Sequence, residues 1–186
     1  LGEAAKTAAD AEQYFMEYKH SIGALASCDG GSDLLSRPGM SIKLSALYPR
    51  YQMSQYTKAT SELCEKLTVL VHMAKEKNIT VTLDAEEADR LDLSLEVFAK
   101  VLADQDIACW GGFGLAVQAY QKRSLSRIDY LASLAKKENA KILVRLVKGA
   151  YWDTEIKASQ VMGLEDYPVF TRKFNTDACY LAWKKN

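Results

Sequence analysis

Short apolar segments rich in branched residues alternate along this chain with longer amphipathic segments. The apolar segments begin near residues 42, 79, 113 and 142, so the repeating unit is roughly 30–37 residues long, close to the size of a strand–helix–strand element. A helix that connects two strands of one sheet makes those strands parallel. The alternation therefore predicts an α/β fold built on a parallel sheet.

The apolar periodicity assigns each segment to a strand or a helix. Strands are predicted over residues 42–47, 79–83, 113–119 and 142–147. Helices are predicted where apolar residues recur at helical spacing, over residues 3–26, 54–77, 89–103, 126–138, 153–161 and 168–184. Residues 28–39 contain Gly, Pro, Ser and Asp and are expected to form a loop.

The unit size separates two kinds of α/β fold. Eight such units close into a (β/α)8 barrel of about 250 residues, and four of them are visible here. No G-x-G-x-x-G or G-x-x-x-x-G-K-[ST] motif follows the first predicted strand, which disfavours a nucleotide-binding doubly wound sheet. We therefore predict the N-terminal half of a (β/α)8 TIM-like barrel, in which residues 1–39 lead into the barrel and residues 40–186 form its first half.

Charge and cysteine content disfavour several classes of protein. Lys plus Arg and Asp plus Glu each number 24, and a net charge of zero argues against a general binder of nucleic acid or anionic membrane. No apolar run approaches the ~18 residues of a transmembrane helix. The four cysteines are widely spaced, which disfavours a metal site and favours a reduced, intracellular setting. The start at Leu1 lacks a signal-peptide pattern and indicates a piece of a longer chain.

Polar residues recur at or near the C-terminal ends of the predicted strands, where barrels bind their ligands. They are Lys43, Asp84, Gln118 and Arg145. Lys43 is flanked by apolar strand residues, so it is either a functional residue or a lysine that extends to solvent. Asp84 is favoured as functional because it still belongs to the strand end. The acids after it, Glu86, Glu87 and Asp89, are expected to cap the next helix.

The segment from Leu143 to Asp153 (LVRLVKGAYWD) changes character along its length. It begins as a buried strand and ends with two cations, a Gly-Ala step, two aromatics and an acid. Gly149 lets a ligand approach the backbone, and Tyr151 and Trp152 can then pack on it. Arg145 could instead form an interior ion pair with Asp84. No histidine lies at a predicted strand end, which favours chemistry carried by an organic cofactor.

Five motifs follow one another along the chain: Ser41–Tyr51, Asp84–Arg90, Gln118–Arg123, Arg145–Asp153 and Tyr167–Lys173. Together they resemble the proline dehydrogenase domain of the bacterial bifunctional proline utilisation A flavoenzymes. The resemblance implies a (β/α)8 barrel that binds FAD noncovalently and oxidises L-proline to Δ1-pyrroline-5-carboxylate, with quinone as the electron acceptor. It also implies a cytoplasmic protein that touches the inner membrane face peripherally. A fused aldehyde dehydrogenase domain is expected in the parent chain, and no nucleic acid is expected to bind this segment.

The resemblance also implies roles for individual residues. The residues placed on FAD are Gln118, Arg145, Val147, Gly149, Trp152, Thr171 and Lys173. Among them Arg145 would lie at the flavin N5 and Gln118 at the isoalloxazine edge, while Thr171 and Lys173 would reach the phosphate and adenosine part. On the substrate side, Lys43 would face the proline carboxylate, and Asp84 and Tyr151 would lie beside the proline ring and amine.

The chain ends at Asn186, before the later strands of the family. Those strands are implied to supply a histidine toward FAD, a tyrosine that packs on the substrate and a pair of arginines for the carboxylate. We therefore expect this segment alone to be inactive. Two alternatives stay open: another (β/α)-barrel enzyme that acts on a carboxylated or phosphorylated substrate, and a catalytically inactive half-barrel.

Overall fold

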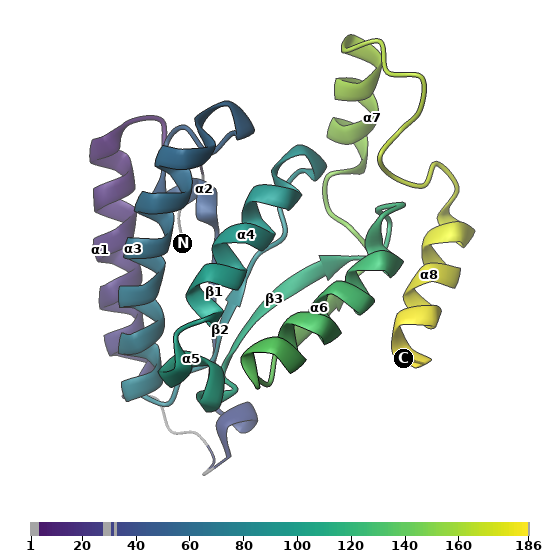
Figure 1. The fold of residues 1–186 in the computed structure, drawn as a ribbon. Helices are drawn as coiled ribbons and strands as arrows, with labels where there is room; N and C mark the ends of the chain where they lie inside the picture. The colour runs from purple at the N-terminus through teal and green to yellow at the C-terminus, as the bar shows by residue number, and fades with distance from the viewer. Residues whose placement is uncertain (1–3, 28–30, 32, 186) are drawn as a thin grey trace.

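A computed structural model describes residues 4–27, 31 and 33–185. Its four strands form one parallel sheet in the order β1-β2-β3-β4. They are β1 (Met40–Ile42), β2 (Val81–Leu83), β3 (Phe113–Gln118) and β4 (Leu143–Val147). Figure 1 shows β1, β2 and β3 next to one another. Neighbours in the sheet are also neighbours in the chain, which is the strand order of a (β/α)8 barrel. The predicted α/β fold, the N-terminal half of a TIM-like barrel, is confirmed.

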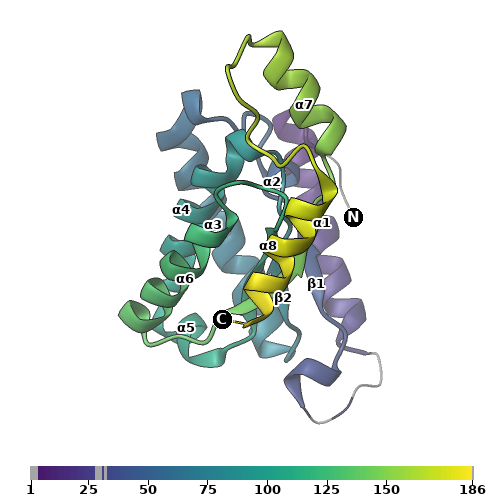
Figure 2. The same ribbon diagram turned by 90° about the vertical axis from the view of Figure 1, so that its right-hand side faces the viewer.

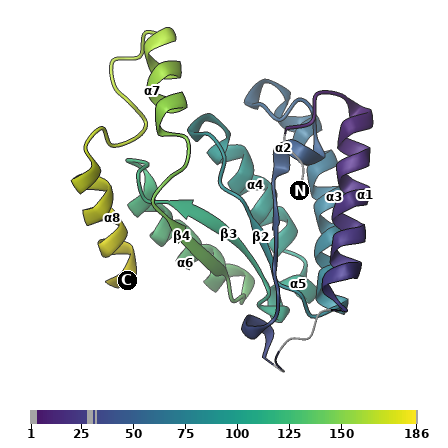
Figure 3. The ribbon, with the colours of Figure 1, turned by 180° about the vertical axis from the view of Figure 1, so that it is seen from behind.

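The helices between the strands cover one face of the sheet, as the view from behind shows (Figure 3). The α-helices among the described residues are α1 (Ala8–Leu25), α2 (Leu44–Leu47), α3 (Tyr56–Glu76), α4 (Leu91–Leu102), α5 (Gln105–Trp110), α6 (Ser124–Glu138), α7 (Trp152–Val161) and α8 (Lys173–Lys185). Three short 3-10 helices are η1 (Leu34–Ser36), η2 (Met53–Gln55) and η3 (Ala88–Arg90). Figure 2 shows α7 beyond the ends of the strands and α8 below it.

The core lies between the sheet and its covering helices. Strand residues that point to the helices are buried and apolar: Met40, Ile42, Val81, Leu83, Phe113, Leu115 and Val117. Phe113 packs against Phe98 of α4 with 4.8 Å between the ring centroids. Because side chains alternate along a strand, the opposite face carries the small or polar residues Ser41, Thr82, Gly114 and Ala116. This face, the inner face, is where Arg145 and its partners lie.

The first predicted strand is wrong in its position. The strand covers Met40–Ile42, and most of the predicted range forms α2 instead. All four residues of α2 are buried, so they have no polar side from which the helical period could be recognised. A distant carboxylate also stabilises this short helix, since Glu86 Oε1 accepts the Ser45 N–H at 3.0 Å. The boundary at residue 39 between a leading segment and a half-barrel stays a prediction.

The remaining predicted elements differ mainly at their ends. The helix predicted from 89 begins as η3, and the last predicted helix begins at Lys173 because Val169 forms an antiparallel bridge with Gln121. α5 was not predicted; Asp104 caps its start and Gly111, with φ of 74°, ends it. Residue 3 of the first predicted helix, and residues 28–30 and 32 of the predicted loop, lie outside the described residues. Within the described part of the chain, no helix is long and apolar enough to cross a membrane.

Candidate active site

An ion pair stands on the inner face near the C-terminal ends of the strands. Arg145, from β4, donates from Nη1 to Ser41 Oγ of β1 at 2.7 Å, and its other terminal nitrogen pairs with the carboxylate of Asp84, directly after β2. The ion pair between Arg145 and Asp84 that the sequence suggested is therefore confirmed. The Arg145 side chain is still 44% exposed, so a ligand over the inner face could reach it.

The acid loop, which we define as Asp84–Arg90, is held by several charged contacts. The Glu86 carboxylate accepts the Ser45 N–H and pairs with Arg90 at 2.9 Å, and Glu87 pairs with Arg90 at 3.2 Å. The prediction that Glu86 caps the helix after it is wrong, because Glu86 caps α2 from a distance. Asp84 is thereby left as the carboxylate of this loop that faces Arg145.

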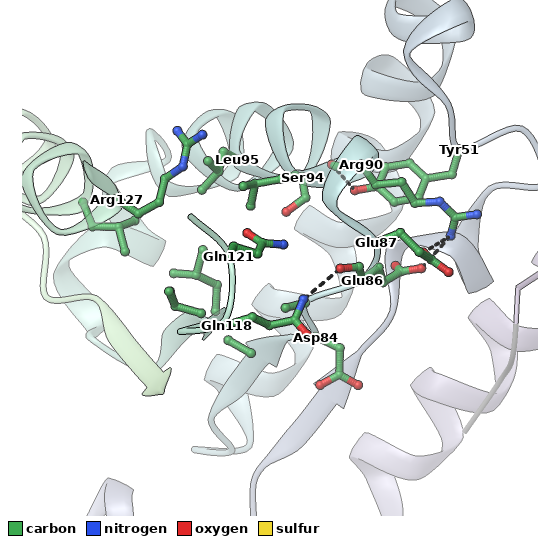
Figure 4. A pocket seen from close by; sticks show the side chains of 16 residues that line it. Tyr51, Asp84, Glu86, Glu87, Arg90, Ser94, Leu95, Gln118, Gln121 and Arg127 are labelled. Carbon is green, nitrogen blue, oxygen red and sulfur yellow. Dashed lines mark hydrogen bonds and ion pairs between the residues drawn. The ribbon is translucent and has the colours of Figure 1, made fainter. Parts of the chain in front are cut away.

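Gln118, the last residue of β3, joins the acid loop to the segment after β4. Its side chain is buried; Nε2 donates to the Glu86 carbonyl at 2.9 Å, and Oε1 accepts the Ala150 N–H at 3.1 Å. A cavity of about 20 Å³, enough for about one water, lies beside it (Figure 4). Its lining includes Tyr51, Ser94, Gln121 and Arg127. The Gln118 amide is thus fixed in one orientation at the strand end.

A second depression, the α8 cleft, has a volume of about 320 Å³. It is lined by Tyr120, Lys148, Gly149, Trp152, Phe170, Thr171, Lys173 and Thr176. Four of the seven residues expected on the cofactor are therefore in one cleft. Trp152 Nε1 donates to the Phe170 carbonyl at 3.0 Å, which ties the start of α7 to the segment before α8. Lys148 pairs with Asp177 of α8 at 2.6 Å.

Gly149 is required where the chain leaves β4. Its φ of 143° is unfavourable for other residues, and an added Cβ would lie 2.4 Å from the ring of Tyr120. We expect Gly149→Ala to lower the free energy of unfolding of the domain by about 1–3 kcal/mol. Urea unfolding measures this change. Gly23→Ala is the matched control, because nothing lies within 4 Å of a Cβ at this position in α1. Equal stability of the two variants would contradict the prediction.

Lys43 lies after β1 rather than inside a strand, which corrects its predicted position. It precedes the first residue of α2, and its N–H donates to Tyr18 Oη at 3.2 Å. Ile42 pairs with Leu83 in the sheet, so Lys43 and Asp84 occupy equivalent places at the ends of neighbouring strands. Among the described residues, no hydrogen-bond or ion-pair partner of the Lys43 ammonium is present. This cation is therefore available for a ligand.

Val147 and Tyr151 lie on either side of the Gly149 turn. Val147 pairs with Gln118 in the sheet, and its carbonyl accepts the Ala119 N–H at 2.8 Å. Tyr151 precedes α7 and is half-buried; burial raises the pKa of its phenol, and the carboxylates of Glu86 and Glu87 raise it further. Tyr151 therefore stays protonated and lies near the acid loop.

Several residues that build the site were not predicted from the sequence. They are Ser41, Tyr120, Lys148, Glu155 and Thr176. The Tyr120 side chain is 3% exposed, and burial raises the pKa of its phenol. Glu155 is buried in the first turn of α7 and accepts the Ala88 N–H at 2.6 Å. Sequence signals existed for three of them: Ser41, Tyr120 and Lys148 each lie within a motif that carries the resemblance, and Lys148 is one of the two cations of the segment Leu143–Asp153.

Comparisons with curated proteins give close relatives along the whole segment. The chain is 49% identical over 185 residues to the bifunctional protein PutA of Klebsiella aerogenes, and the match covers 100% of this chain and 14% of that protein. It is 47% identical over 175 residues to the bifunctional protein PutA of Rhizobium meliloti, with 94% and 14% covered. The chain thus spans 14% of the length of these relatives.

Solved structures agree with the sequence matches. A crystal structure of Bradyrhizobium japonicum proline utilization A superimposes with a TM-score of 0.95 at 52% identity, covering 98% of this chain and 19% of that one. A structure of the protein from Bdellovibrio bacteriovorus, described as inactivated by N-propargylglycine, has a TM-score of 0.88 at 30% identity and covers 97% and 20%. The family model for proline dehydrogenase matches residues 1–185. With a family match over nearly its full length and a fold shared with PutA structures, the chain belongs to the proline dehydrogenase family.

Proposed function

We propose that the protein containing this segment oxidises L-proline to Δ1-pyrroline-5-carboxylate, with FAD as the cofactor. The observation that carries the proposal is the match of residues 1–185 to the proline dehydrogenase family. The geometry supports it, because two cations and a carboxylate stand at one level of the sheet: Arg145 within β4, Asp84 directly after β2 and Lys43 directly after β1. Ligands of (β/α)8 enzymes bind at this end.

The residues present fit FAD. The α8 cleft combines the cations Lys148 and Lys173 with the hydroxyls of Thr171 and Thr176, which suits phosphate groups. The aromatic side chain of Tyr120 also lines the cleft. We infer that Thr171 and Lys173 hold the phosphate and adenosine part. Val147, Gly149 and Trp152 would lie along the cofactor between this part and the flavin ring, which would meet Gln118 and Arg145.

The bound cofactor would supply the acceptor for the hydride that leaves C5 of proline. Arg145, held by Ser41 and Asp84, would place a fixed positive charge beside the flavin ring. This charge would stabilise the negative charge that develops on the ring during the reaction. Lys43 would bind the proline carboxylate and so orient C5. Asp84 and Tyr151 would enclose the proline ring and amine. The small residues of the inner face would let the flat ring and the substrate approach the sheet.

The proposal extends to the partners of the whole protein. We infer quinone as the electron acceptor, and hence peripheral contact of a cytoplasmic protein with the inner membrane face. A fused aldehyde dehydrogenase domain accords with the name "bifunctional" given to the relatives and with their greater length. We expect no nucleic acid to bind this segment, whose formal net charge is zero.

The direct test adds saturating L-proline to the full-length protein without oxygen. Loss of the visible absorbance of bound flavin is the expected result. A flavoprotein whose spectrum is unchanged would contradict the proposal and would favour another (β/α)-barrel activity on a carboxylated or phosphorylated substrate. A protein without flavin would favour the inactive half-barrel.

Lys43→Ala in the full-length protein is expected to raise the KM for proline about tenfold or more, since hydrogen bonds to charged groups contribute about 1.5–3 kcal/mol. The ratio of flavin to protein should stay unchanged, because the inferred partner is the substrate carboxylate. Steady-state kinetics and the flavin spectrum measure both quantities. Lys58→Ala, at an exposed position of α3, is the control. Loss of flavin with an unchanged KM would reassign Lys43 to the cofactor.

A further inference from the structure

One buried carboxylate connects α7 to the acid loop. Glu155 is 6% exposed, and its Oε1 accepts the Ala88 N–H at 2.6 Å. Ala88 is the first residue of η3, whose N–H has no partner within its own turn. A hydrogen bond to a carboxylate is stronger than one to a neutral acceptor. The contact therefore fixes the middle of the acid loop from a helix 67 residues away in the chain.

The acid loop is tied to the segment after β4 at a second point, by Gln118. This side chain bonds the Glu86 carbonyl on one side and the Ala150 N–H on the other. Glu86 and Ala88 are thus both anchored to residues between Gly149 and the first turn of α7. Asp84 begins the anchored loop, and Tyr151 belongs to the anchoring segment, so the two ties set their relative positions.

The Glu155 carboxylate makes its hydrogen bond outside α7. Burial of a carboxylate is unfavourable and raises the pKa of Glu155, an effect that its bond to Ala88 opposes. Ser159, one turn along the same buried face and 1% exposed, donates its hydroxyl to the Glu155 carbonyl at 2.7 Å, so its bond stays within α7. An apolar side chain at position 155 would suit the helix but would leave the Ala88 N–H unsatisfied.

We propose that Glu155 is a positioning residue that holds the acid loop against α7 and thereby sets Asp84 and Tyr151 relative to Arg145. The inference rests on the proposed oxidation of proline and assigns Glu155 no contact with substrate or cofactor. Trp152 and Glu155 lie on the same first turn of α7. The hydrogen bond between Glu155 and Ala88 therefore connects two parts of the inferred site. One is the helix that carries Trp152 of the α8 cleft, inferred for the cofactor, and the other is the loop that carries Asp84, inferred for the substrate.

The first test compares three variants of the full-length protein. Glu155→Met removes the acceptor, and we expect kcat/KM for proline to fall about ten- to a hundredfold, as for small displacements of reacting groups. Glu155→Gln keeps a side-chain oxygen for the Ala88 N–H and should restore most of the loss. Ser159→Ala is the matched control on the same face of α7 and should change kcat/KM less than about twofold. Equal losses for the Met and Gln variants would overturn the proposal.

The second test separates positioning from a general loss of stability. In an Asp84→Ala background, adding Glu155→Met should have little further effect on kcat/KM, because residues that act through one another are not additive. If Glu155→Met lowered kcat/KM by the same factor in the Asp84→Ala background as in the wild type, the proposal would be overturned.

Amide hydrogen exchange in residues 84–91 should be faster in Glu155→Met than in the wild type and unchanged in Ser159→Ala. Unchanged exchange in Glu155→Met would also overturn the proposal. The exchange measurement tests the tie even if the wild type fails to oxidise proline, a result that would refute the proposed function alone.

Discussion

Replacing Arg145 with methionine in the full-length protein is expected to slow reduction of the bound flavin by proline about a hundredfold or more. Loss of one preorganised donor from an active site typically costs about 2.7–4 kcal/mol of transition-state stabilisation. The guanidinium bridges Ser41 and Asp84, so its removal also releases the carboxylate that it orients. Folding should be affected little, because the side chain is 44% exposed and both partners can be hydrated without it.

The measurement is anaerobic stopped-flow reduction at saturating proline, together with thermal unfolding of each variant. Lys141→Met is the matched control, because Lys141 is exposed and precedes the N-terminal end of the same strand. Residues at that end of a barrel strand serve stability rather than chemistry. If Arg145→Met kept the reduction rate of the wild type, the assignment of Arg145 to the flavin would be wrong.

The fold was predictable where the apolar pattern of a segment fitted only a strand or only a helix. β3 and β4 are mostly apolar segments between turn residues, and α3 and α6 have a clear polar side. Their observed bounds therefore lie within two residues of the predicted ones. α2 could not be predicted, because a helix buried on every side has no amphipathic period. That error placed Lys43 inside a strand, whereas it follows one.

The site was predictable only in part, for a physical reason. Asp84 and Arg145 were found because parallel strands bring their C-terminal ends to one edge of the sheet. The partners of the acid loop were not found, because Glu86 bonds Ser45 and Glu155 bonds Ala88 across 41 and 67 residues. A glutamate near the start of a helix is already explained by that helix's own dipole. Such tertiary capping leaves no local pattern in a sequence.

The second large effect concerns the segment by itself. We expect residues 1–186, produced alone, to bind FAD at well below one per chain and to leave proline unoxidised. Among the described residues, β1 pairs only with β2 and β4 pairs only with β3, so the sheet has two open edges that could pair with another chain. Arg145 and Lys43 face a space that the other half of a closed barrel would enclose. The resemblance also implies that a pair of arginines from later strands completes the carboxylate site.

Exposed apolar side chains add to this expectation. Val144 of β4 is 41% exposed, and Val161, Phe174 and Leu181 around α7 and α8 are between 59% and 79% exposed. Apolar surface and free strand edges together favour self-association. The test is to purify the segment, measure its flavin-to-protein ratio and determine its size by gel filtration, with the full-length protein as the control. A monodisperse monomer that carries one FAD and loses its flavin absorbance with proline would contradict the prediction. It would mean that these four strands alone hold a complete site, and that the inner face needs no opposite wall to bind the flavin.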